Sequence, residues 1–199
     1  MQNLAHQLRV IERLPTGWNC GALAGRFTEL SSPGAGSTLT MAFGVVAELQ
    51  AQGEPTAWVL SSRDCFYPPD AAAGGVDLAA LAVIFAPGAQ ATARAADKLL
   101  RSGAFGAVIL DLGTHLNIPM PLQSRLAALA QEYQSVVLCL TQKDEQAPSL
   151  SSLISLRGQA LRHSFADGRF QCRIQILKDK RRGPGWVHEE VCRATPGLC

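Results

Sequence analysis

The chain is expected to fold as an α/β protein with a mainly parallel central sheet. Short apolar runs alternate with amphipathic segments over residues 26–142, which is typical of strand–helix–strand crossover units. From Phe170 to Ile176 the pattern changes to strict alternation of apolar and polar residues, which indicates a strand with two different faces. The Asp167-Gly168 pair before it predicts a hairpin turn. We therefore expect C-terminal antiparallel strands to extend the parallel sheet.

Strands are predicted from apolar runs that are too short to be helices. Ala57 to Leu60 has no polar face, which is typical of a strand covered on both sides of the sheet. The segment Ser61 to Asp70 contains two prolines and is expected to be a loop. Residues 152–165, interrupted near Gly158, are expected to pair with the alternating strand. The expected parallel strands are residues 27–30, 57–60, 81–85, 105–110 and 135–140.

Helices are predicted where apolar side chains recur every three or four residues. Such a stripe runs from Leu39 through Ala42 and Val46 to Leu49. Gly103 stands where a helix beginning at residue 89 would need its C-terminal cap. The expected helices span residues 3–13, 38–50, 89–102 and 121–133.

Length and composition favour a globular protein. The 199 residues are 47% hydrophobic and 17% charged, which suits one domain with a buried core. We expect residues 1–14 to form an N-terminal helix or arm and residues 15–199 to form a single core domain. The sequence has no signal segment and no apolar run of membrane-spanning length, so a cytoplasmic protein without a membrane partner is expected. The six cysteines contain no C-x-x-C pair, which argues against a zinc or disulfide framework.

Positive charge is concentrated near the C-terminus. Residues 1–150 carry nine basic and twelve acidic side chains, whereas residues 151–199 carry nine basic and four acidic ones, a net charge of +5. The densest part is the run KDKRR at residues 178–182, just before a Gly-Pro-Gly turn. This run is either a solvated surface or a contact with protein or nucleic acid. It contains no aromatic residues on which bases could stack, and Trp186 is expected to pack in the core or at the sheet edge.

A loop rich in glycine and serine joins the first parallel strand to its helix. On the phosphate-binding pattern G-x-x-x-x-G-K-[ST] it runs from Ser31 to Thr38 and includes Gly34. The second glycine, Gly36, and Thr38 fit the pattern. Ser31 replaces the first glycine, and Ser37 replaces the lysine that would contact phosphate. This loop has two possible interpretations: a structural turn between strand and helix, or a loop that still binds an anion.

Two polar residues stand at the ends of later strands. Asp111 ends the strand at residues 105–110, and Gln142 follows the strand at residues 135–140. Asp111 has two interpretations: a ligand for Mg²⁺ near Thr38, or a structural acceptor that caps the neighbouring loop or bonds Thr38. For Gln142, too, a structural hydrogen bond is an alternative to a functional role.

Several of these motifs resemble those of the RecA recombinases. GRFTELSSPGAGSTLT resembles their P-loop region, and RSGAFGAVILDLG resembles their Walker B strand, which places the Walker B carboxylate at Asp111. VVLCLTQ resembles the strand that ends in the sensor glutamine, here Gln142. RIQILKDKRRGPG resembles the strand with two lysines, here Lys178 and Lys180. The resemblance covers residues 16–190 and implies a RecA-like P-loop core.

Within that superfamily, the chain is most similar to the ImuA family, RecA-like companions of an error-prone polymerase cassette. The residues that carry this similarity are AWVLSSRDCFYPPDAAAGGVDLAALAVIFAP, followed by RSGAFGAVI. The recombinase glutamate that orients the attacking water falls at Arg63, and the tyrosine that packs on adenine falls at Asp70. Together with Ser37, three parts of the catalytic apparatus are missing. The resemblance therefore implies a protein without ATPase activity, catalytic residues, metal or cofactor, in which ATP binding is not expected.

The resemblance also implies partners. In active recombinase filaments the two lysines reach the nucleotide of the neighbouring subunit. We expect an adaptor in the SOS-type DNA damage response and translesion mutagenesis that binds RecA and the polymerase-like ImuB, in the cytoplasm or at the nucleoid. Lys178, Lys180, Arg181 and Arg182 are the expected contacts with a partner, or weakly with DNA. Two alternatives stay open: an allosteric or slow ATPase that takes a lysine from elsewhere, and a DNA repair protein that contacts DNA through its basic strand.

Overall fold

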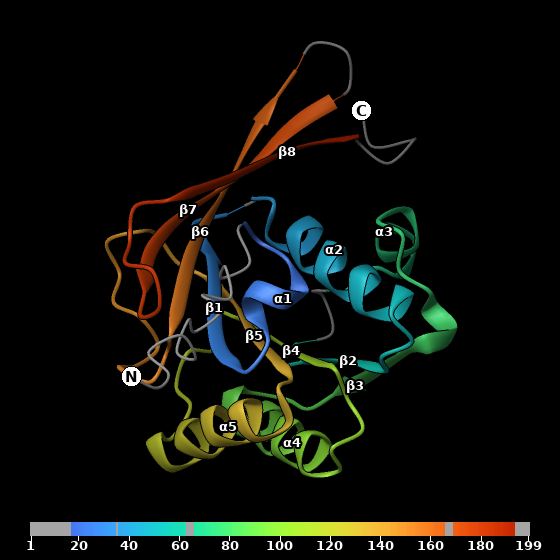
Figure 1. Ribbon diagram of the computed structural model, residues 1–199, viewed down its shortest axis with the longest axis vertical. Helices are drawn as coiled ribbons and strands as arrows, with labels where there is room; N and C mark the ends of the chain where they lie inside the picture. The colour runs from blue at the N-terminus through green and yellow to red at the C-terminus, as the bar shows by residue number, and fades with distance from the viewer. Residues whose placement is uncertain (1–16, 35, 63–65, 166–168, 194–199) are drawn as a thin grey trace, which may run out of the picture.

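The computed structural model describes residues 17–34, 36–62, 66–165 and 169–193; of Arg193 it describes only the backbone. A central sheet carries helices on both faces, and long antiparallel strands extend from one of its edges (Figure 1). The expected N-terminal helix, Arg63 and the expected Asp-Gly hairpin turn lie outside the described residues.

The described part of the chain forms one eight-stranded sheet. The strands are β1 (Arg26–Ser32), β2 (Thr56–Leu60), β3 (Leu81–Phe85), β4 (Ala107–Gly113), β5 (Val136–Gln142), β6 (Leu156–Ser164), β7 (Arg169–Asp179) and β8 (Val187–Arg193). The helices are α1 (Cys20–Leu23), α2 (Thr38–Ala51), α3 (Pro68–Ala73), α4 (Ala89–Arg101) and α5 (Met120–Tyr133), with a 3₁₀ turn, η1 (Leu78–Ala80).

The spatial order of the strands is β3-β2-β4-β5-β1-β6-β7-β8. All pairs from β3 to β6 are parallel, and β7 is antiparallel to both β6 and β8. The predicted parallel sheet with antiparallel C-terminal strands is therefore confirmed. The second partner of β7, strand β8, was not predicted, because its residues include the polar run His188 to Glu190, which lacks an apolar alternation.

Two layers of helices cover the sheet. Helices α1, α2 and α3 lie on one face, and α4 and α5 lie on the other (Figure 1). The alternation of side chains along β1 sends Leu30 into the first apolar cluster and Phe27 into the second, so this strand is buried on both faces. None of the described helices is long and apolar enough to cross a bilayer.

The end of α4 lies where the sequence predicts it, but the start of α3 does not. Gly103 comes directly after the C-cap of α4 with a left-handed φ of 67°, as predicted, because a helix commonly ends in this conformation. The loop expected up to Asp70 is wrong from Pro68 onward, where α3 begins. Proline is tolerated in the first turn of a helix, since its missing N–H has no partner there anyway. The two prolines therefore begin a helix here and do not prevent one.

The interruption expected near Gly158 is confirmed as an irregularity in β6. The register of β6 against β7 shifts between Arg157 and Gly158. A Cβ atom at Gly158 would lie 2.5 Å from Cγ2 of Ile174, so a side chain would force the two strands apart. This glycine lets β7 approach closely and thereby sets the position of the basic residues at the end of β7.

Candidate functional site

A shallow cleft lies at the carboxyl end of the parallel strands, where β1 leads into α2. Its volume is about 280 Å³. The lining residues are Ser32, Gly34, Thr38, Leu39, Asp111, Gly113, Leu140, Thr141 and Gln142. Strand β5 lies between β1 and β4, so Thr38, Gln142 and Asp111 come from three successive positions along this edge. The structure thus brings together these three residues, and ligands of open α/β sheets generally bind at this edge.

The loop that borders the cleft is closed by its own hydrogen bonds. The Ser32 hydroxyl and the Gly36 N–H both donate to the Gly34 carbonyl, at 2.9 and 2.8 Å. The Thr38 hydroxyl donates to Oγ of Ser32 at 2.8 Å. A Cβ at Gly36 would lie 2.6 Å from Cβ of Ser32, so this turn requires glycine. An amide and a hydroxyl that would face phosphate and Mg²⁺ in a P-loop are therefore used within the loop itself.

Ser31 belongs to β1, and the predicted start of the loop is wrong by two residues. Strand β1 continues through Ser32 because β5 pairs with it at Thr141 and Gln142. The fully buried Ser31 hydroxyl donates to Oε1 of Gln159 on β6 at 2.7 Å. Pairing with strands on both sides overrides the turn propensity of the two serines, and the loop is correspondingly short.

Ser37, at the position of the P-loop lysine, faces away from the cleft. It occupies the N-cap position of α2, but its side chain caps no amide of the helix. Its hydroxyl, which is only 1% exposed, donates to the carbonyl of Leu161 on β6 at 2.8 Å. The side chain therefore fastens the start of α2 to the antiparallel strands. Its role in this structure is structural, and it does not line the cleft.

Asp111 supplies the only charged side chain among the described residues that line the cleft. It is 4% exposed and accepts a hydrogen bond of 3.3 Å from Nε1 of Trp58. Burial raises the pKa of Asp111 to about 6, although the Trp58 hydrogen bond acts in the opposite direction. The structural hydrogen bond considered between Thr38 and Asp111 is replaced by the one from Thr38 to Ser32.

The charge of the cleft lining does not favour binding of the phosphates of a nucleotide. Above pH 6 it presents a carboxylate, and its described lining contains no lysine or arginine to neutralise phosphate. Asp70, at the position of the adenine contact, lies in the first turn of α3 and is not among the lining residues. The exposed side chain of Gln142 stands at the rim, at the last residue of β5.

A buried ion pair anchors the loop that follows Gln142, and the sequence analysis missed it. Glu29 on β1 is fully buried and lies 2.5 Å from Nζ of Lys143. It also accepts hydrogen bonds from the Thr141 hydroxyl at 3.1 Å and from the Leu150 amide at 3.0 Å. The guanidinium of Arg157 donates to two further carbonyls of the same loop. The sequence signal for this ion pair was the single glutamate in the predicted buried strand, because buried carboxylates require a cation or several donors.

A second buried carboxylate organises the basic turn, which we define as residues 178–182. Asp179 forms an ion pair with Arg26 at 2.7 Å, and both side chains are almost fully buried. It also accepts from the Arg181 amide at 2.8 Å and from Nε1 of Trp186 at 3.1 Å. The half-buried Trp186 lies at the sheet edge, as predicted, and the Arg182 guanidinium stacks 4.6 Å from its ring centre. These contacts give the basic turn a defined shape.

The two lysines of the basic turn contact the same segment, residues 151–152. Lys178 donates from Nζ to the carbonyls of Ser151 and Ser152 at 3.5 and 3.4 Å, and Lys180 donates to Ser152 at 2.6 Å. Burial lowers the pKa of Lys178, and the charge of Lys180 lowers it further. Lys180, Arg181 and Arg182 are exposed. None of these four cations is among the residues that line the cleft.

Comparison with models of known protein families gave no match, and neither did comparison with curated proteins. No relative therefore assigns a role to the cleft or to the basic turn. A functional interpretation has to come from the contacts of the residues themselves and from the motifs that they resemble.

Proposed function

We propose that this protein is a catalytically inactive, RecA-like adaptor that supports mutagenic DNA repair by binding RecA and a polymerase-like ImuB partner. The main support for the proposal is that the cations of the basic turn are not part of the cleft. The cleft that would hold a nucleotide has no cation in its described lining. The lysines of the basic turn do not line this cleft and donate to the Ser152 carbonyl, where they would be available to a second molecule.

The contents of the cleft support the absence of ATP hydrolysis. Phosphoryl transfer depends on positioned cations and dipoles that neutralise charge on the transferred group. Here Ser37 bonds β6, and the Gly36 amide and the Thr38 hydroxyl are engaged within the loop. Asp111 remains as a carboxylate with a raised pKa and no described cation beside it in the cleft. These groups cannot replace the missing lysine and glutamate.

The basic turn supports a one-sided role in a RecA assembly. Lys178 and Lys180 presently donate to neutral backbone carbonyls, and a phosphate group would be a stronger, charged acceptor. The subunit would offer these lysines to the nucleotide of an ATP-bound RecA neighbour. Its own cleft could not serve a further subunit in the same way. Such a protein would bind at one end of a RecA filament and leave another surface for the polymerase-like partner.

The test is a binding measurement with purified partners. The chain should bind ATP-loaded RecA and, separately, the ImuB-type protein. Lys178→Ala with Lys180→Ala should weaken RecA binding by at least about tenfold, because a buried charged hydrogen bond to phosphate contributes about 1.5 to 3 kcal/mol. Binding to the ImuB-type protein should be unchanged. The matched control is Arg94→Ala with Lys98→Ala, which removes two exposed cations from α4. If the folded protein bound neither partner, the proposal would be wrong.

Direct DNA binding is the second candidate, and the three adjacent exposed cations Lys180, Arg181 and Arg182 favour it. Contacts of lysine and arginine with phosphates release counterions, so the affinity should fall steeply as salt concentration rises. Replacing all three residues by Glu should abolish this binding. Equal DNA affinity of that variant and the parent chain would eliminate the candidate.

A further inference from the structure

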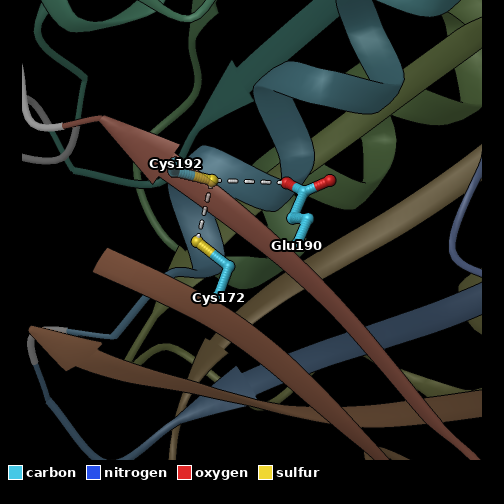
Figure 2. Close-up of side chains that lie close together, drawn as sticks. All are labelled: Cys172, Glu190 and Cys192. Atoms are coloured by element: carbon cyan, nitrogen blue, oxygen red, sulfur yellow. Dashed lines mark hydrogen bonds between the residues drawn. The ribbon is translucent and has the colours of Figure 1, made fainter. Parts of the chain in front are cut away.

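Strands β7 and β8 bring two cysteines and a glutamate together, and none of the three lines the cleft (Figure 2). Sγ of Cys172 lies 3.2 Å from Sγ of Cys192, which lies 3.5 Å from Oε1 of Glu190. The three potential ligand atoms all lie within 4.8 Å of one another. Cys172 is fully buried, Cys192 is half-buried and Glu190 is exposed, so the group extends from the core to the solvent.

The register of the two strands produces this group. Cys172 pairs directly with Glu190, while Cys192 pairs with Phe170, two residue pairs further along. Alternate residues of a strand share a face, so His188, Glu190 and Cys192 lie on the same side of β8. On β7 the same side carries Cys172, which belongs to the apolar cluster beneath α2. The sulfur atoms of Cys172 and Cys192, 20 residues apart in the chain, therefore meet on one face of the β7–β8 pair.

His188 lies beside the carboxylate of this group. Its Nδ1 accepts a hydrogen bond of 3.3 Å from the Trp18 amide, so the neutral imidazole carries its proton on Nε2. That Nε2 atom is buried, has no hydrogen-bond partner and lies 3.7 Å from Oε2 of Glu190. Interaction with His188 lowers the pKa of Glu190, and burial opposes this effect only in part. Glu190 is therefore ionised at neutral pH beside two thiols.

We propose that Cys172, Cys192 and Glu190 form a binding site for a borderline-soft divalent metal ion, with Zn²⁺ as the representative. Thiolates together with a carboxylate match the ligand preference of Zn²⁺, which takes four ligands in a tetrahedral arrangement. The fourth position would be taken by a water molecule on the exposed side, and Nε2 of His188 lies 3.7 Å from the Glu190 carboxylate. This site is independent of the adaptor function proposed above.

The distances fit such an ion with a small adjustment. With metal–sulfur bonds of about 2.3 Å and a metal–oxygen bond of about 2.1 Å, tetrahedral geometry separates the sulfurs by about 3.8 Å. It separates sulfur from oxygen by about 3.6 Å. The two sulfurs are 3.2 Å apart, and Sγ of Cys192 lies 3.5 Å from the Glu190 carboxylate. Sγ of Cys172 lies within 4.8 Å of that carboxylate, so the Cys192 and Glu190 side chains would have to rotate to close the site.

Metal binding would change the protonation state of the two thiols. Burial raises the pKa of Cys172 and Cys192, and for Cys192 the neighbouring sulfur and the charge of Glu190 add to this effect. Both groups are therefore protonated thiols at neutral pH, a form that is unreactive toward oxidants. On metal binding, each S–H bond is replaced by a metal–sulfur bond, and two protons pass to the solvent. No electrons are transferred.

The experiment uses the full chain, reduced and freed of metal with a chelator, and Co²⁺ as the probe. We expect one Co²⁺ per chain with a thiolate-to-metal charge-transfer band in the near ultraviolet, which Zn²⁺ then displaces. Zn²⁺ binding should release two protons per chain, measured with a pH indicator. Cys172→Ser and Cys192→Ser should each abolish the band. Cys20→Ser and Cys139→Ser, which alter buried cysteines outside the site, should leave it unchanged.

Glu190→Gln keeps both thiols and changes only an exposed side chain, so it separates loss of the site from loss of the fold. It should weaken Co²⁺ binding by at least about tenfold while the unfolding temperature of the metal-free chain stays the same. Absence of a charge-transfer band in the parent chain would overturn the proposal. So would a band that persists in the Cys172→Ser, Cys192→Ser double variant. Formation of a Cys172–Cys192 disulfide in air, with no uptake of metal by the reduced chain, would instead identify a redox pair.

Discussion

Single side chains decide what the cleft can do. Ser37 is the clearest case, because it replaces the residue that would contact phosphate and uses its hydroxyl to hold the Leu161 carbonyl. A lysine at this position would have to leave the 1%-exposed location of the serine and reach back across the loop. Asp111 is the second case, since the same carboxylate that could bind Mg²⁺ is here only 4% exposed and accepts a hydrogen bond from the indole N–H of Trp58.

The raised pKa of Asp111 predicts a pH-dependent effect of Asp111→Asn. The carboxyl titrates at about 6 in the folded chain and at 3.8 as a free group, so the folded state binds its proton more tightly. Wild-type stability should therefore fall as pH rises from about 4 to about 6. Above pH 6 the neutral variant should be more stable than the parent by up to about 3 kcal/mol. The gain should shrink toward zero as pH falls to 4. Urea unfolding at pH 7.5 and at pH 4.5 measures this difference.

The control for Asp111→Asn is Glu145→Gln, which removes an exposed carboxylate from the loop after β5. Its effect should stay within about 0.5 kcal/mol at both pH values, because surface substitutions rarely do more. A destabilising effect of Asp111→Asn at pH 7.5 would mean that the carboxylate has a charged partner that the cleft, as described, does not contain.

At the scale of elements, the loop from Lys143 to Leu150 is attached firmly to the sheet. Its first residue pairs with the buried Glu29, its last residue donates its amide to the same carboxylate, and Arg157 bonds carbonyls between them. A loop fastened at both ends and in the middle should move less than a loop that is held only at its ends.

Lys143→Met should therefore destabilise the protein by about 3 kcal/mol at neutral pH. The change leaves Glu29 as a fully buried carboxylate without its cation, and an uncompensated buried charge is strongly unfavourable. Urea unfolding gives the loss of stability, and faster hydrogen exchange at the Leu150 amide reports release of the loop. The matched control, Lys98→Met, removes an exposed cation from α4 and should change stability by less than about 0.5 kcal/mol.

The double variant Glu29→Gln, Lys143→Met tests the cause of this loss. It removes both charges, so it should recover a large part of the stability lost in Lys143→Met. If the double variant were as unstable as the single one, packing of the lysine side chain, and not its charge, would hold the loop.

At the scale of the whole molecule, nucleotide should not stabilise the folded state. A ligand that prefers the folded chain raises its stability by about 2.7 kcal/mol at a hundred times its dissociation constant. We expect no change in unfolding temperature with millimolar ATP and Mg²⁺, compared with Mg²⁺ alone, because the described cleft lining contains no cation for phosphate. RecA measured in parallel provides the positive control. A rise of several degrees for this chain would favour the allosteric ATPase alternative.

Local patterns in the amino-acid sequence were sufficient for the main elements of the fold. Helix α2, strand β3 and the turn at Gly103 lie where periodicity and glycine placed them, and the irregularity at Gly158 was anticipated. Gln142 ends β5, close to its expected place, whereas β4 continues two residues beyond Asp111, which was expected to end that strand. These inferences need only neighbours along the chain.

Contacts between distant segments depended on strand order and register, which the periodicity does not specify. Because β5 flanks β1, Ser31 became part of a strand, and Lys143 reached Glu29. Because β7 pairs with β8, Cys172 met Cys192 and Glu190, although no cysteine spacing in the sequence indicated a metal site. Residue types and periods thus predicted most of the longer elements, but not α3 or β8. The tertiary structure alone decides which buried charges and thiols face one another, since each such contact joins residues that are remote in the chain.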